Sequence, residues 1–140
     1  MAGVISHLLM PDHLFVFGTL LSAYDHPMSR RLSAEARLVG AARCRGRLYL
    51  VRHYPGMVLS DDVAEQVHGE VFRMHDAAAL LRVLDSYEGC APGATEPTEY
   101  VRRRVTVTLD DDRTFEAWTY VYNWPVAHLP RIASGKFLEH

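Results

Sequence analysis

The chain has 140 residues, of which 49% are hydrophobic, and a formal net charge of −2 at pH 7. This length and composition predict one domain with a single hydrophobic core. Basic and acidic residues are mixed along the chain, so nothing indicates a nucleic acid or a membrane as a partner.

The first predicted element is a buried strand over residues 14–17, where a β-branched and aromatic run stops at a glycine. Residues 1–13 have no sustained period and predict a loose arm. Gly18 has no Cβ, so the chain can turn sharply or approach a ligand closely there. We expect the later chain to wall a pocket around the backbone N–H groups of residues 17–20.

Apolar residues at roughly helical intervals predict a short helix over residues 28–38, ended by Gly40. Arginines that alternate with other residues predict a strand over residues 41–51, with one face in water. The Tyr54-Pro55-Gly56 stretch predicts a loop. Residues 67–74 alternate again and form the next predicted strand.

The next predicted helix follows Asp76, an N-cap residue placed before a run of strong helix formers, and ends near Gly89. Residues 90–98 are rich in Pro, Gly and Thr and predict a surface loop. Strands over residues 101–109 and 114–122 flank a short acidic turn, which predicts a hairpin.

The tail from Asn123 contains two prolines and is expected to run irregularly over the surface. About five strands and two helices occur in this order, without the βαβ alternation of a parallel sheet. We therefore predict an α+β fold, a compact mixed β-barrel with flanking helices.

The two cysteines, Cys44 and Cys90, form neither a disulfide framework nor a CxxC motif. The sequence shows no signal-peptide pattern and no apolar run of about eighteen residues, so we expect a cytoplasmic protein. Residues 138–140 resemble the remnant of a histidine tag. A single domain is therefore expected over residues 1–137.

Glu88 is the candidate for chemistry. On the helix after Asp76 it continues the apolar stripe of Leu80, Leu81 and Leu84, which points its carboxylate at the interior. In the alternative interpretation the last helical turn frays and Glu88 meets water. The helix dipole disfavours an acid at the C-terminus, and this favours a functional reason for its presence.

Other polar residues give less specific signals. The eight histidines lack HxH or HExxH spacing, so we predict no metal site. Cys90 is either a nucleophile or an ordinary loop thiol. The Arg102-Arg103-Arg104 run is expected to face solvent or to pair with acids on neighbouring strands, with anion binding as the alternative. Tyr120 and Tyr122 share a strand face, which fits core packing or a cavity wall.

Four stretches occur in a fixed order along the chain: residues 15–20, 84–89, 100–107 and 132–137. Together they resemble the motifs of the gamma-glutamylcyclotransferase-like family, and the match spans residues 14–137. The resemblance implies a barrel with a cavity whose floor is the loop after the first strand. It also implies a homodimer and no metal, nucleotide or redox cofactor.

The resemblance assigns a role to particular residues. Backbone N–H groups of one loop would bind the α-carboxylate of the substrate, and that loop is Phe17, Gly18, Thr19 and Leu20. Glu88 would be the single acid/base. Tyr100 and Pro55, within Tyr54-Pro55-Gly56, would border the pocket, and Tyr120 is expected to line it.

The implied partner is a small-molecule γ-glutamyl amine or amide. Its own α-amine attacks the side-chain carbonyl, closes a five-membered ring and releases 5-oxoproline and a free amine. Ring closure is intramolecular, so much of its entropic cost is met once the substrate is held folded. A buried glutamate with a raised pKa would take the proton of the α-ammonium and pass it to the leaving nitrogen.

The chain departs from the family in two places. Phe17 stands where the family has a tyrosine, which removes a hydroxyl but not the backbone N–H. A glycine usual beyond the loop is missing from residues 21–24, which bears on the shape of the pocket mouth. Two alternatives stay open: a non-catalytic small-molecule or partner-binding module on the same barrel, and a metal-dependent hydrolase with histidines around Glu88.

Overall fold

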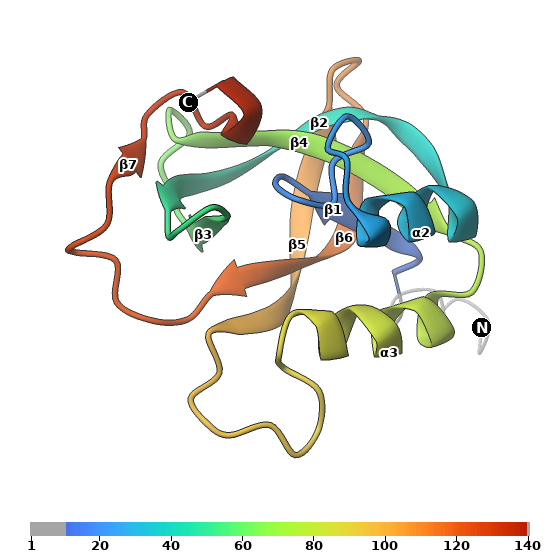
Figure 1. Ribbon diagram of the computed structural model, residues 1–140. Coiled ribbons are helices and arrows are strands. Elements are labelled where there is room, and N and C mark those ends of the chain that lie inside the picture. Colours follow the sequence, from blue (N-terminus) through green and yellow to red (C-terminus); the bar gives the residue numbers. More distant parts are fainter. Residues whose placement is uncertain (1–10, 140) are drawn as a thin grey trace, which may run out of the picture.

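The computed structural model describes residues 11–139. Within them five strands close into a barrel, because β2 pairs with β4 on one side and with β5 on the other. In order around the barrel these strands are β2 (Ala36–Leu50), β4 (Gln66–Met74), β1 (His13–Val16), β6 (Thr114–Tyr122) and β5 (Tyr100–Leu109). The two α-helices of the described residues lie outside the barrel (Figure 1), so the predicted fold class is confirmed.

β1 lies between β4 and β6 in the barrel wall. Its side chains alternate between two cores, as a strand requires. Phe15 packs with the side chains of the barrel interior, whereas Leu14 and Val16 pack with those under the helices. Both faces of β1 are therefore buried, which explains its unbroken apolar sequence. β1 therefore holds the start of the following loop, residues 17–20, in a fixed position.

α3 (Ala77–Tyr87) begins as predicted. Asp76 is its N-cap, and Asp76 Oδ1 accepts a hydrogen bond from Ala79 N at 3.2 Å. The side chains that face the barrel are at most 3% exposed: Leu80, Leu81 and Leu84. Packing of this stripe fixes the end of the helix against β5 and β6. No helix in the described part of the chain is long and apolar enough to cross a membrane.

The predicted helix over residues 28–38 is wrong at its C-terminal end. α2 (Pro27–Glu35) stops before Ala36, whose φ of −148° and ψ of 160° are already extended. Ala36 and Leu38 pair with β4, and Gly40 lies inside β2 just after a register shift. Apolar residues two apart fit the period of a strand as well as a short helical window, and pairing with β4 decides between them.

The predicted loop at residues 54–56 is wrong in part, because Pro55 begins the short strand β3 (Pro55–Leu59). Proline lacks an N–H and is tolerated at the first residue of a strand. β3 pairs with the far end of β2, where Gly56 lies opposite Tyr49. The hairpin and the strand over residues 67–74 are confirmed.

The C-terminal tail is irregular, as predicted, apart from β7 (Arg131–Ile132) and the 3-10 helix Phe137–Glu139. Residues 138–140, the predicted tag remnant, lie partly in this helix and partly outside the described residues. The predicted arm over residues 1–13 also lies mostly outside them.

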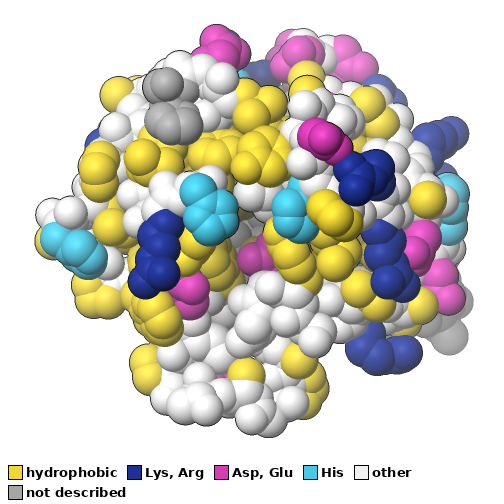
Figure 2. Space-filling view, in the orientation of Figure 1, with side chains coloured by type: hydrophobic (Ala, Val, Ile, Leu, Met, Phe, Trp, Pro, Cys, Tyr) yellow, Lys and Arg dark blue, Asp and Glu magenta, His cyan; other side chains and the backbone are white. Residues whose placement is uncertain are grey.

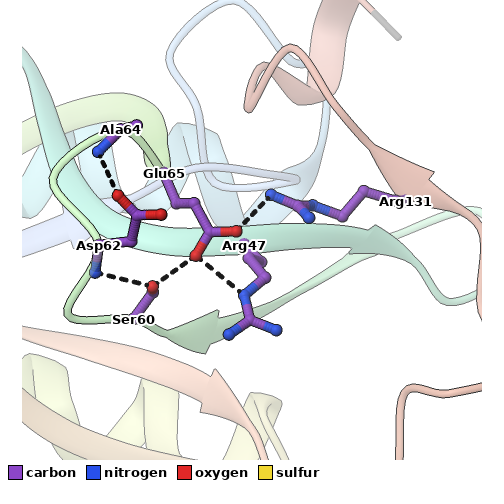
Figure 3. A network of polar contacts seen from close by, with 6 residues as sticks. All are labelled: Arg47, Ser60, Asp62, Ala64, Glu65 and Arg131. Carbon is purple, nitrogen blue, oxygen red and sulfur yellow. Dashed lines mark hydrogen bonds and ion pairs between the residues drawn. The ribbon is translucent and has the colours of Figure 1, made fainter.

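A polar network around Glu65 fastens this tail to the barrel (Figure 3). Glu65 Oε1 accepts from Ser60 Oγ at 2.6 Å and from Arg47 Nε at 3.1 Å. Glu65 Oε2 accepts from Arg131 of β7 at 3.3 Å. The bond from Ser60, and then the charge of Arg47, hold the pKa of Glu65 below its usual value. The network therefore joins β2, the β3–β4 loop and β7.

Candidate active site

A cavity of about 330 Å³ opens between the loop after β1, the end of α3 and the starts of β3 and β5. Figure 2 shows a hollow on this face, with histidine side chains at its rim and an acidic side chain inside. The size is within the range of small-molecule sites. All eight predicted site residues line the cavity: Phe17, Gly18, Thr19, Leu20, Pro55, Glu88, Tyr100 and Tyr120.

The loop after β1 turns tightly at the cavity floor. Leu21 N donates to Gly18 O at 3.0 Å. Within residues 11–139, no hydrogen bond occupies the backbone N–H groups of Thr19 and Leu20. The Phe17 ring is 8% exposed and packs beside Phe15 in the barrel core. The loop thus lines the cavity and has two backbone donors without a partner among the described residues.

Gly18 is required by a neighbour within the protein. A Cβ at Gly18 would lie 2.6 Å from Pro55 Cγ and 2.9 Å from Pro55 Cδ, closer than carbon atoms pack. The close approach of the loop to β3 therefore explains the glycine. The sequence-based prediction of a close approach to a ligand stays a prediction.

Gly18→Ala is expected to lower the free energy of unfolding by about 1–3 kcal/mol, because the new methyl group displaces the Pro55 ring or the loop. The same shift should raise KM for any ligand of the cavity. Thermal unfolding and steady-state kinetics measure the two effects. Gly18→Ala with Pro55→Ala removes the atoms that clash, so the double variant should be more stable than the sum of the single losses. Additive losses would contradict the assigned contact.

Glu88 is the residue that follows α3, and its N–H donates to Leu84 O at 2.8 Å. The chain then turns away at Gly89, whose φ is +76°, a value that favours glycine. The Glu88 side chain thus continues the buried leucine stripe into the cavity. The helix end is not frayed, because the Glu88 N–H bond to Leu84 O is formed, and Glu88 is half-buried and not fully open to water.

Burial, and then the charge of Glu99, raise the pKa of Glu88 to about 7. Burial disfavours the carboxylate because the cavity wall solvates it poorly. Within the described residues Glu88 forms no salt bridge that would oppose this effect. A carboxyl group of this kind exchanges a proton near neutral pH.

Three tyrosine hydroxyls of the cavity donate their protons to acceptors in the protein. The bonds are Tyr54 Oη to Glu99 Oε2 at 2.7 Å, Tyr100 Oη to Pro55 O at 2.6 Å and Tyr120 Oη to Asp85 Oδ1 at 2.6 Å. Burial raises the pKa of all three, that of Tyr54 to about 12, so they stay protonated at neutral pH. Each hydroxyl has one proton, so towards the cavity these oxygens are acceptors.

A chain of hydrogen bonds runs from His26, at the cavity mouth, to the loop after β1. His26 Nδ1 accepts the Met28 N–H at 3.0 Å, so its ring proton is on Nε2. Nε2 lies 3.5 Å from Tyr87 Oη, which lies 3.2 Å from Thr19 Oγ1. Either hydroxyl of the Tyr87–Thr19 pair can be the donor. The loop end of the cavity therefore has unoccupied backbone donors, and the tyrosine end offers acceptors.

Asp85, one turn before Glu88 on α3, holds the tyrosine end in place. Besides Tyr120, it accepts two bonds from Arg102, at 2.9 and 3.3 Å. The Arg102 guanidinium also lies 4.5 Å from the centre of the Trp118 ring. Arg102 thus pairs with an acid on a helix, whereas Arg104 pairs with Glu116 on the neighbouring strand, as predicted for the arginine run.

Several cavity residues were missed by sequence reasoning, namely His26, His53, Tyr87 and Glu99. Glu99 lies directly before Tyr100, in a segment whose sequence carries no periodic or motif signal for a site. Among residues 11–139, no group of three or more His, Cys, Asp or Glu side chains is arranged to hold a metal ion. Burial raises the pKa of the Cys90 thiol, which fits the interpretation as an ordinary thiol.

The sequence pattern of the family described as gamma-glutamyl cyclotransferase, AIG2-like, matches residues 14–139. The chain belongs to this family. It is 36% identical over 129 residues to the gamma-glutamylcyclotransferase family protein YtfP of Escherichia coli K12, with 90% of this chain and 96% of the relative covered. The predicted family is therefore confirmed.

Solved structures show the same fold. The solution structure of Escherichia coli ytfP matches with a TM-score of 0.62 at 31% identity, over 91% of this chain and 96% of that chain. An AIG2-like protein from Mus musculus matches with a TM-score of 0.67 at 22% identity, over 86% and 85% of the two chains. The family fold is thus present over almost the whole described chain.

Proposed function

We propose that the protein is a cofactor-independent gamma-glutamyl cyclotransferase, which releases 5-oxoproline and a free amine from a γ-glutamyl amine or amide. The observation that carries the proposal is the position of Glu88, with a pKa of about 7, in the same cavity as the donor-rich loop. Family membership supports this reaction class. A cytoplasmic location and a homodimer stay predictions from the sequence.

The loop after β1 anchors the α-carboxylate in this proposal. The N–H groups of Thr19 and Leu20 have no partner among the described residues, and both residues line the cavity, so these donors are available to the carboxylate. Consecutive backbone donors in a turn hold an anion without a basic side chain. Anchoring at this end directs the γ-carbonyl towards Glu88. The Phe17 ring takes no direct part, because it packs into the core.

Glu88 moves two protons in succession. Its carboxylate takes a proton from the bound α-ammonium, and the freed amine attacks the γ-carbonyl carbon to form the ring C–N bond. The protonated Glu88 gives that proton to the leaving nitrogen as the original amide C–N bond breaks. The carboxylate so regenerated takes the second proton from the ring nitrogen and passes it to the released amine, which leaves as an ammonium ion. No water is consumed and Glu88 ends as it began. A pKa near the working pH suits a group that must both accept and donate.

The rate should follow the ionisation of Glu88. The carboxylate is the active form of the free enzyme, so kcat/KM should rise about tenfold per pH unit below about 7 and level off above it. At pH 5 the value should be about 100-fold below the plateau. A pH profile from 5 to 8.5 in constant ionic strength measures this. A profile that is flat through pH 6 would contradict a base with the pKa assigned to Glu88.

The proposal is tested by 5-oxoproline release from a panel of γ-glutamyl amines, γ-glutamyl amino acids and γ-glutamyl amino sugars. Equal amounts of 5-oxoproline and free amine are expected, since the reaction splits one molecule into two. Release without a stoichiometric amine would exclude the cyclotransferase. A folded protein that binds panel members but releases nothing would favour the alternative, a non-catalytic binding module.

A further inference from the structure

We propose that Glu99 sets the specificity for the leaving amine by binding a second ammonium group on it. The preferred substrates would be γ-glutamyl derivatives of diamines or other amines that carry an additional positive charge. This inference rests on the proposed cyclotransferase function and names the part of the substrate that the family assignment leaves open.

The charge of the cavity favours a cation. Among residues 11–139, two carboxyl groups line it, Glu88 and Glu99, and no lysine or arginine does. Within the described residues neither carboxyl group takes part in a salt bridge. The α-ammonium of a γ-glutamyl group would meet Glu88, the proposed base. Glu99 is then a carboxylate for which the γ-glutamyl part alone offers no cationic partner.

The hydrogen-bond polarity of the cavity points the same way. Tyr54, Tyr100 and Tyr120 have donated their protons to the protein, so their oxygens accept bonds from a ligand. A ligand that satisfies this end must bring hydrogen-bond donors. A protonated amine brings three donors, whereas an alkyl group brings none and would leave the acceptors dehydrated and unpaired.

Hydrogen bonds within the protein fix the side chain and the backbone of Glu99 before a ligand binds. Tyr54 Oη donates to Oε2 at 2.7 Å, which leaves Oε1 for a ligand. The Glu99 carbonyl accepts Asn123 N at 2.7 Å, and the Asn123 side chain donates to Thr98 O at 3.0 Å. These bonds tie the backbone directly before β5, at Thr98 and Glu99, to Asn123, directly after β6. A pre-organised carboxylate loses less freedom when it binds a cation.

A cation at Glu99 would also assist the reaction. The Glu99 charge contributes to the raised pKa of Glu88, and neutralising that charge favours the Glu88 carboxylate. Other ionisable groups near Glu88 are the hydroxyls of Tyr87 and Tyr100 and the Cys90 thiol, all with raised pKa values. They stay neutral at pH 7, so Glu99 is the neighbouring charge that a substrate can change.

The test compares two substrates with the same four-carbon chain, γ-glutamyl-1,4-diaminobutane and γ-glutamyl-butylamine, which differ in one terminal ammonium group. The wild type is expected to favour the diamine derivative by about tenfold or more in kcat/KM, the scale of one charge-assisted hydrogen bond. Glu99→Gln should lower the value for the diamine derivative until the two substrates are within about twofold. The effect of Glu99 on Glu88 in the free enzyme is common to both substrates, so the ratio measures what the second ammonium group gains at Glu99, through binding and through its effect on Glu88.

Glu96→Gln is the matched control, since Glu96 is exposed in the loop before β5 and lies outside the cavity. Its ratio should equal that of the wild type. Inhibition by free 1,4-diaminobutane that is clear in the wild type and much weaker in Glu99→Gln gives a second measurement. Turnover of both substrates with an unchanged ratio in Glu99→Gln, or equal inhibition of the wild type and Glu99→Gln by 1,4-diaminobutane, would overturn the inference alone. Absence of 5-oxoproline from the whole panel would overturn the proposed function with it.

Discussion

Glu88→Gln is expected to lower 5-oxoproline release by about 100- to 10,000-fold, the usual contribution of a general acid/base. Glutamine has the shape of glutamic acid but cannot take the proton of the α-ammonium. The loss should fall on kcat more than on KM, because the α-carboxylate anchor lies on the loop after β1. Single-turnover and steady-state assays on a substrate selected from the panel measure both parameters.

The same substitution should stabilise the fold above neutral pH. Glu88 has a pKa of about 7 in the folded protein against an ordinary value of 4.5 for a glutamate in the unfolded chain. Between these two values the unfolded chain has released the proton that the folded protein still holds, so stability falls as pH rises through this window. Above pH 7 the full cost applies, on the order of 3 kcal/mol. Glu88→Gln removes this cost, so it should melt higher than the wild type at pH 8 and equally at pH 4.

Two observations keep the roles of Glu88 apart. Glu96→Gln, an exposed change of the same kind, should alter neither turnover nor the pH dependence of melting. A Glu88→Gln protein with turnover near that of the wild type would remove Glu88 from the mechanism. Equal stability of Glu88→Gln and the wild type at pH 8 would instead show that the carboxyl group is better solvated than its place in the cavity indicates.

Local sequence signals predicted an element correctly where residues within that element stabilise it. The helix after Asp76 has its own N-cap and its own apolar stripe, and the hairpin has a turn between two alternating arms. They failed where a distant strand decides the outcome. Ala36 and Leu38 became part of β2 because β4 pairs with them, and Pro55 began β3 because β2 offers an edge. No short window of sequence contains that partner.

The cavity, too, has some residues that the sequence predicted and some contacts that only the fold brings together. The Glu88 side chain was placed in it by helical periodicity, and the other residues by resemblance to family motifs. The Tyr54–Glu99 and Tyr120–Asp85 bonds join residues 45 and 35 positions apart and leave no pattern in the sequence. The acceptor-rich end of the cavity, on which the specificity inference depends, therefore became visible with the fold.

Gly69→Ala is expected to cause the largest loss of stability among these variants. Gly69 lies on β4 beside the end of β1, its antiparallel neighbour. A Cβ at Gly69 would lie 2.0 Å from Val16 O and 3.1 Å from Phe15 Cε1. A backbone oxygen cannot rotate away as a flexible side chain does, so β1 itself has to move. We expect a loss of about 3 kcal/mol or more, at the upper end of overpacking effects. Thermal unfolding should show a decrease of about 10 °C in Tm.

Gly40→Ala is the matched control, because it also adds a methyl group to a barrel strand. Its Cβ would meet Leu109 Cδ2 at 3.7 Å, an ordinary contact, so Tm should change by no more than a few degrees. Val16 ends β1 directly before the loop that carries the proposed carboxylate anchor. Any folded Gly69→Ala protein should therefore show a higher KM together with its lower Tm. Equal melting of the two alanine variants would mean that β1 and β4 are not in such close contact, and the position of the loop would then need another cause.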